Sequence, residues 1–138
     1  MGNCDGAKWD MRIRRRGTIE DISFILRLRE DLAGNLTGEV LDPITGNPIP
    51  GAAVISGRCM GGVIAEPGFS LMTLRLRLAP ERANGISLTG LVNGEAPTAN
   101  FGGTYRNLDE PGDTGTGGGS QTPLRSEPNQ EKEQEYEG

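Results

Sequence analysis

The sequence predicts an all-β domain, a small antiparallel up-and-down β-barrel of seven or eight strands, with a seven-stranded β-sandwich as the alternative. Apolar and polar residues alternate through most of residues 8–105, and no apolar stripe recurs at helical spacing. Three alternating segments carry an apolar residue followed by Ser or Thr and then Gly, at 36–38, 55–57 and 88–90. Glycine inside a strand costs stability, so its repeated use favours a strongly curved sheet.

The first two strands are predicted to form a hairpin around Gly17-Thr18, which has the Gly-x form of a two-residue turn. This turn places each inward apolar residue opposite another, in the pairs Trp9–Leu26, Met11–Phe24 and Ile13–Ile22. On the outer face it places Arg14 opposite Asp21. Because a shift by one residue would move every side chain to the other face, this matching supports the register.

The same alternation predicts the remaining strands. A three-residue turn at 32–34 pairs Leu28 with Gly38 and Arg27 with Glu39. Long loops at 42–51 and 60–68 flank a strand at 53–59. Two more strands follow, and Asn93-Gly94 predicts a hairpin into a seventh strand at 99–105. The inward residues of the fifth and sixth strands are Met72, Leu74, Leu76, Leu78, Ile86, Leu88, Gly90 and Val92.

Charge and composition divide the chain into three parts: a flexible leader at 1–6, the barrel domain at 7–107 and a tail at 108–138. Residues 1–107 carry a balance of +1, whereas the tail carries −6. The tail is rich in Gly, Pro and Glu, so we expect it to be disordered. We also expect it to compete with anionic partners for the arginine-bearing face of the barrel.

The N-terminus lacks the features of a secretory signal, and no apolar run is long enough to span a membrane, so we expect a cytoplasmic location. In that compartment Cys4 and Cys59 are expected to be free thiols. Asn35-Leu36-Thr37 has the form of a glycan acceptor, but we interpret Asn35 as a turn residue. Residues 1–4 resemble a dual acylation signal on Gly2 and Cys4, but Gly6 departs from the pattern, so a lipid anchor is not favoured.

Segments such as Leu36-Thr37-Gly38 and Leu88-Thr89-Gly90, together with Gly6-x-x-Trp9, resemble those of calycin-like barrels, the group that includes avidins and lipocalins. The resemblance covers about residues 6–107 and implies an up-and-down barrel. The spacing before Trp9 is one residue longer than the family pattern, and Trp9 is the only tryptophan. We therefore carry over the architecture and no binding residue.

The composition argues against most enzyme classes. The chain has no histidine, which removes the usual general base and the commonest metal ligand. Two distant cysteines make a poor zinc site, so we expect no metal and no cofactor. The candidate catalytic acids are Asp10, Glu20, Asp21 and Glu39. They are better explained as surface charges or partners of arginine, so we assign no catalytic residue.

The arginines suggest a basic surface, but nucleic-acid binding is not favoured because acidic residues pair with several of them and the body is almost neutral. The arginines concerned are Arg12, Arg14, Arg15, Arg16, Arg27, Arg29, Arg75 and Arg77.

The function predicted first is non-catalytic binding of a small apolar or amphipathic ligand inside the barrel, lined by Trp9, Phe24, Phe101 and Tyr105. The second is a protein interaction or assembly module, including a homo-oligomer, that uses a strand edge or the arginine face. The third is an enzyme of the cyclase or isomerase type. An interior pocket above ~300 Å³ with a few inward polar groups would favour the first hypothesis, and a filled interior would favour the second.

Overall fold

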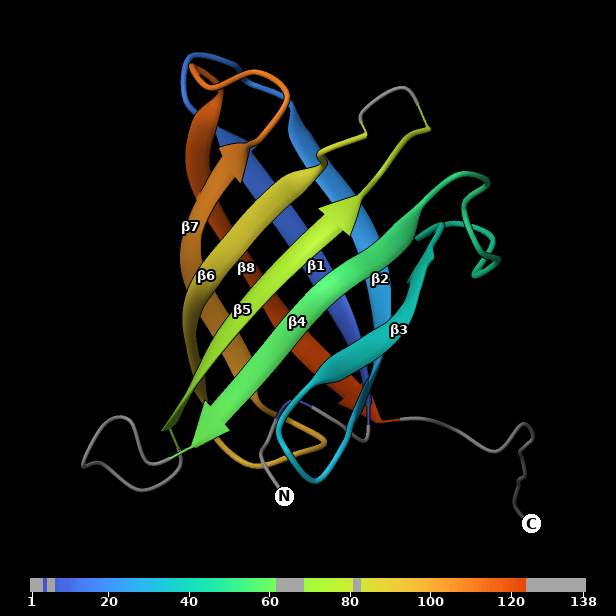
Figure 1. Cartoon of the computed structure of the whole chain (residues 1–138), viewed down its shortest axis with the longest axis vertical. Helices are drawn as coiled ribbons and strands as arrows, with labels where there is room; N and C mark the ends of the chain where they lie inside the picture. Colours follow the sequence, from blue (N-terminus) through green and yellow to red (C-terminus); the bar gives the residue numbers. More distant parts are fainter. Residues whose placement is uncertain (1–3, 5–6, 62–68, 81–82, 124–138) are drawn as a thin grey trace, which may run out of the picture.

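Eight antiparallel strands form a single sheet in the computed structural model, which describes residues 4, 7–61, 69–80 and 83–123 (Figure 1). The strands are β1 (Ala7–Arg15), β2 (Asp21–Glu30), β3 (Leu36–Leu41), β4 (Ala53–Gly61), β5 (Phe69–Arg77), β6 (Ile86–Asn93), β7 (Asn100–Asn107) and β8 (Thr114–Pro123). Their order in the sheet is β3-β2-β1-β8-β7-β6-β5-β4. None of the described residues forms a helix, so this part of the chain contains no helix capable of crossing a membrane.

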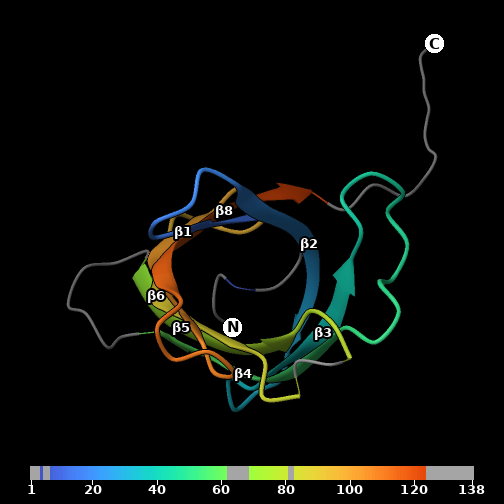
Figure 2. The same ribbon diagram turned by 90° about the horizontal axis from the view of Figure 1, so that it is seen from above.

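The sheet curls into a nearly closed barrel, and the view along its axis shows the strands as a ring (Figure 2). The edge strands β3 and β4 meet at the bridge between Asn35 and Arg58, where the Cys59 N–H also donates to the Gly34 carbonyl at 2.7 Å. Farther along β3, the following loop folds back, and its Ile49 N–H donates to the Val40 carbonyl at 3.1 Å. The predicted barrel is therefore confirmed in preference to the sandwich.

The predicted registers are confirmed. Met11 lies opposite Phe24 and Arg14 opposite Asp21 in the first hairpin, and Leu28 lies opposite Gly38 in the second. The inward alternation places large apolar side chains in one continuous core, and the largest fully buried ones include Trp9, Tyr105, Phe24, Met11 and Ile13. The hairpin predicted at Asn93-Gly94 is also present, with Asn93 opposite Asn100, and β7 begins one residue later than predicted.

The eighth strand corrects the predicted domain boundary. Residues 114–123 were expected to belong to a disordered tail, but they pair along β1 on one side and β7 on the other. The strand contributes few apolar side chains of its own, and its neighbours fill the space beneath it. A Cβ on Gly117 would lie 2.8 Å from Leu88 Cδ2. The prediction of disorder from amino-acid composition was wrong because β8 is stabilised by hydrogen bonds to two neighbouring strands and not by apolar side chains of its own. The rest of the predicted tail, 124–138, lies outside the described residues, as does its proposed competition for the arginine face.

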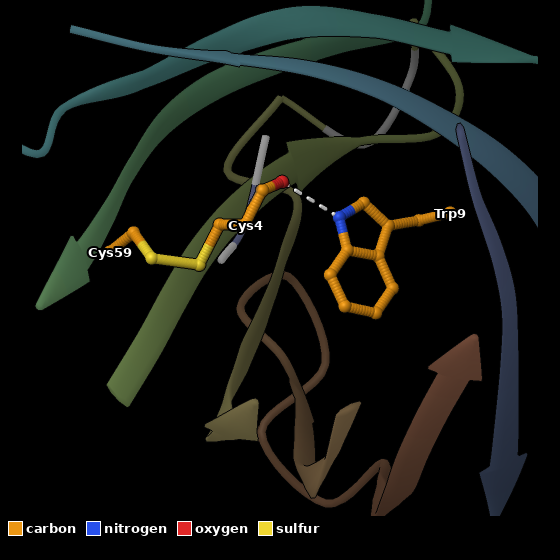
Figure 3. Close-up of a disulfide and its surroundings, with 3 residues drawn as sticks. All are labelled: Cys4, Trp9 and Cys59. Carbon is orange, nitrogen blue, oxygen red and sulfur yellow. Dashed lines mark hydrogen bonds between the residues drawn. A yellow bond between two sulfur atoms is a disulfide. The ribbon is translucent and has the colours of Figure 1, made fainter. Parts of the chain in front are cut away.

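The predicted free thiols are also corrected, because Cys4 and Cys59 form a disulfide (Figure 3). Cys4 is fully buried, and its carbonyl accepts a hydrogen bond from the Trp9 indole Nε1–H at 2.9 Å. Fifty-five residues separate the two cysteines, so only the folded barrel brings them together. The Cys4 sulfur is consumed in this bond and is not available for an acyl chain. The cytoplasmic location stays a prediction, although disulfides persist mainly in oxidising compartments.

Candidate functional site at the barrel mouth

The end of the barrel opposite the disulfide is its mouth, where the loops following β1, β3, β5 and β7 lie. A partly open pocket of about 180 Å³ is formed there, and its lining combines apolar and polar side chains. Its lining residues are Arg15, Ile22, Leu78, Gly85, Ile86, Tyr105, Asn107, Glu110 and Asp113.

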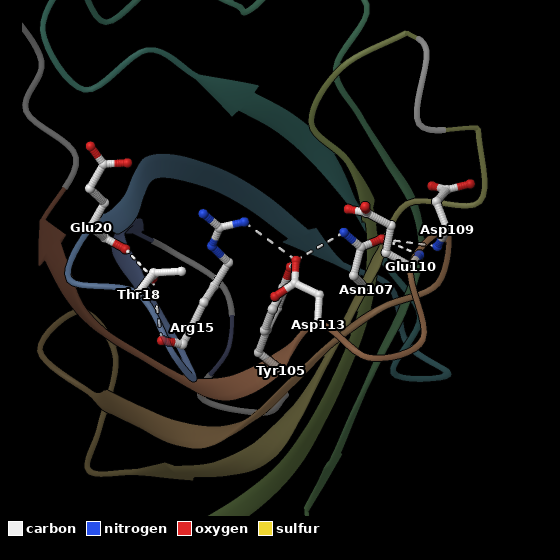
Figure 4. A network of polar contacts seen from close by, with 8 residues as sticks. All are labelled: Arg15, Thr18, Glu20, Tyr105, Asn107, Asp109, Glu110 and Asp113. Atoms are coloured by element: carbon white, nitrogen blue, oxygen red, sulfur yellow. Dashed lines mark hydrogen bonds and ion pairs between the residues drawn. The ribbon is translucent and has the colours of Figure 1, made fainter.

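Four of these residues form a polar cluster, the mouth network, which consists of Arg15, Tyr105, Asn107 and Asp113 (Figure 4). The Asp113 Oδ2 atom accepts hydrogen bonds from the Tyr105 hydroxyl at 2.8 Å, Asn107 Nδ2 at 3.1 Å and Arg15 Nη1 at 3.4 Å. Arg15 and Tyr105 both lie opposite Gly115, which has no side chain, so both long side chains fit beside this strand. The network thus joins β1 and β7 to the loop before β8.

The network perturbs two ionisable groups. Burial, followed by the hydrogen bond to Asp113 and the charge of that carboxylate, raises the pKa of Tyr105 to about 12. Burial alone would raise the pKa of Asp113. The hydrogen bonds from Asn107 and Tyr105 and the charge of Arg15 together outweigh burial and hold this pKa below its ordinary value. At neutral pH the network therefore contains one guanidinium, one carboxylate and a protonated phenol.

The four predicted ligand-binding residues lie at different places relative to the mouth pocket. Tyr105 lines the mouth, whereas Trp9, Phe24 and Phe101 do not. Trp9 lies toward the disulfide end, and Phe24 and Phe101 are 1% and 5% exposed within the core. That these three residues bind a ligand stays a prediction.

Sequence reasoning missed Arg15, Asn107 and Asp113 as site residues. Arg15 was assigned to an outer basic surface, yet it continues the inward positions of Trp9, Met11 and Ile13, so the alternation already contained the signal. Asn107 and Asp113 had no such signal, because the loop between them becomes part of the mouth only when β8 pairs with β7.

The candidate acids on the outer face mostly have the predicted surface role. Asp21 forms ion pairs with Arg14 at 3.3 Å and Arg12 at 3.8 Å, and Glu39 pairs with Arg27 at 3.8 Å. The hydrogen bond to Asp21, and then its charge, raises the pKa of Arg14. Asp10 and Glu20 are exposed.

One group of residues has metal-ligand chemistry. Possible donor atoms of Cys4, Glu30 and Cys59 lie within 4.8 Å of one another. Both sulfurs belong to the disulfide, however, so the group offers no thiolate, which is the form of cysteine that binds a metal.

Comparisons with protein-family models, curated proteins and solved structures found no match. The likeness to calycin-like barrels therefore rests on the architecture of the sheet.

Proposed function

We propose that the protein binds a small amphipathic molecule at the barrel mouth without catalysing its conversion. The observation that carries this proposal is the combination of apolar and polar side chains in the lining of the mouth pocket. Ile22, Leu78 and Ile86 supply apolar surface, and the mouth network supplies donors and a carboxylate acceptor beside it. Ligand pockets generally combine an apolar lining with a few polar groups that fix orientation.

The charge of the network favours a neutral polar head on the ligand. Arg15 and Asp113 form an ion pair at 3.4 Å, so neither presents an uncompensated charge to the pocket. Glu110, the other carboxylate in the lining, is exposed at the rim, where water solvates its charge. A hydroxyl or primary amide can accept a hydrogen bond from one member of the network and donate one to another. A carboxylate or ammonium head would compete with the existing ion pair and lose its own hydration.

The volume limits the ligand to a small body or to one end of a larger molecule. About 180 Å³ equals roughly six water volumes and is below the range of drug-sized pockets. The core beneath the mouth is filled by side chains such as Ile13 and Leu88, which are fully buried. The ligand is therefore expected to enter the mouth and stop above this layer.

The test is an NMR titration of the full chain with three probes of similar size: benzyl alcohol, toluene and benzoate. Benzyl alcohol is expected to shift the backbone amide signals of Tyr105, Asn107 and Asp113 more strongly than either comparator. Leu78→Trp should fill the pocket and abolish the shifts. Ile44→Trp is the matched control, since Ile44 is 92% exposed and lies outside the pocket.

Two outcomes contradict the proposal. One is equal binding of benzyl alcohol by the Leu78→Trp and Ile44→Trp variants. The other is a set of shifts confined to residues away from the mouth. A folded Leu78→Trp variant, recognised by an unchanged pattern of remaining amide signals, makes either result decisive.

The second candidate is an assembly module acting through the β3–β4 seam. It is favoured by the filled interior of the barrel and by the limited pairing of these two edge strands. Native mass spectrometry of the full chain distinguishes the candidates. An oligomer that dissociates on substitution at the seam favours assembly, whereas a monomer that carries a small ligand favours the mouth.

A further inference from the structure

A second hollow lies on the outer wall of the barrel, away from the mouth. This outer groove has a volume of about 450 Å³ and shares no lining residue with the mouth pocket. It is lined by Asn35, Ser56, Gly57, Arg58, Thr73, Leu74, Arg75 and Ser87. Two irregularities border it: the bulge in β4 between Val54 and Ser56, and the bridge between Asn35 and Arg58 at the seam.

The groove carries two arginines whose charge no described carboxylate neutralises. Among the described residues, neither Arg58 nor Arg75 has a carboxylate within ion-pairing distance, in contrast to the paired Arg14 and Arg27. Because Ser56 lies opposite Arg75 and Arg58 opposite Thr73, the two arginines are diagonal neighbours on adjacent strands. Their backbones are then about 7–8 Å apart, so their guanidinium groups can converge on one anion.

Arg75 is held in place for such a role. Its Nε–H donates to the Asn84 carbonyl at 2.9 Å, which leaves the terminal nitrogens of the guanidinium for another acceptor. Arg58 is exposed and makes no side-chain hydrogen bond within the described chain. An arginine already fixed at one nitrogen loses less conformational entropy when it binds an oxyanion.

The rest of the polar lining consists of uncharged groups. Ser56, Thr73 and Ser87 provide hydroxyls, Asn35 provides an amide, and none of the described lining residues carries a carboxylate. Asp31, in the adjoining turn, already accepts hydrogen bonds from the Asn35 backbone at 2.8 Å and from Asn35 Nδ2 at 3.1 Å. These bonds, the backbone one first, hold the pKa of Asp31 below its ordinary value.

From this arrangement we infer that the outer groove binds the phosphate monoester of a small polyhydroxylated molecule, such as a hexose phosphate. A phosphate monoester carries a charge of about −1.5 to −2 at neutral pH, which matches two guanidinium groups. The hydroxyl and amide side chains suit the hydroxyls of the carrier. None of the described lining residues is aromatic, so they do not provide the stacking that a nucleobase requires.

The experiment is an NMR titration of the full chain with glucose 6-phosphate, compared with glucose and with inorganic phosphate. Glucose 6-phosphate is expected to give saturable shifts of the amide signals of residues 56–58 and 73–75, with an affinity above that of either comparator. Arg58→Gln and Arg75→Gln should each weaken binding at least about tenfold. Arg58→Lys should weaken it less, because the charge remains while the paired donors are lost.

Arg16→Gln is the matched control, since Arg16 is an exposed arginine in the turn after β1 and lies outside the groove. Unchanged affinity in both groove variants, an equal loss in the Arg16 variant, or the absence of shifts in the groove would overturn the inference. Equal affinity for inorganic phosphate would overturn the part that concerns the polyol. The Arg58 side chain has no other partner in the described chain, so Arg58→Gln should fold normally. A loss of affinity in this variant therefore reports on binding and not on unfolding. Failure here leaves the mouth proposal unaffected, since the two sites share no residue.

Discussion

Breaking the Cys4–Cys59 disulfide is expected to remove a large part of the stability of the barrel. The bond closes a loop spanning a sequence separation of 55 residues. The chain-entropy relation for such a loop gives about 14 cal/mol/K, or about 4 kcal/mol at 25 °C. The tether also holds the Cys4 carbonyl against the Trp9 indole, and a buried N–H that loses its acceptor costs about 1 kcal/mol or more. A loss of about 4 kcal/mol corresponds to about 15 °C in Tm for a domain of this size.

The assay is urea unfolding followed by the fluorescence of Trp9, the only tryptophan in the chain. Wild-type protein is compared with and without a thiol reductant, and the Cys4→Ser/Cys59→Ser double variant is treated identically. Reductant should lower the midpoint of the wild type and leave that of the double variant unchanged. A loss of stability below about 1 kcal/mol would refute the entropic reasoning. Alkylation of two thiols in the native, unreduced protein would refute the disulfide itself.

Three further predictions concern the glycines and the mouth network. Gly103→Ala should destabilise the barrel by about 1–3 kcal/mol, because the new Cβ would overlap the Thr89 carbonyl oxygen and lie 2.6 Å from Gly90 Cα. Gly102→Ala should be neutral or stabilising, because nothing lies within 4 Å of the new Cβ. Equal urea midpoints for the Gly103→Ala and Gly102→Ala variants would contradict the packing argument. Tyr105 should ionise near pH 12, which the difference in tyrosinate absorbance between wild type and Tyr105→Phe measures. Because the pKa of Tyr105 is raised in the folded protein, its contribution to stability is complete below about pH 10. This contribution is lost as the pH rises toward 12. Asp113, whose folded pKa is lowered, should contribute stability above about pH 4 that is lost as the pH falls further, and Asp113→Asn should remove this acid dependence.

The candidate site was only partly predictable from the sequence. The alternation that placed Trp9, Met11 and Ile13 inward also pointed to Arg15, although its charge led to the opposite assignment. Asp113 lies outside every alternating segment, and its place beside Tyr105 depends on the pairing of β8 with β7. The outer groove likewise needs β4, β5 and the turn before β3 to be assembled before Arg58 and Arg75 become neighbours of Asn35.

Local pattern by itself determined the strand directions, the inward faces and the registers of the first two hairpins. A period of two residues and a short turn act over a few residues, so they can be read directly from the chain. Tertiary structure alone decided the eighth strand and the disulfide. The glycine-rich segment 114–123 becomes a strand because β1 and β7 offer it hydrogen-bonding edges and fill the core beneath it. Cys4 meets Cys59 because closure of the sheet brings the start of β1 close to the end of β4, which no local pattern encodes.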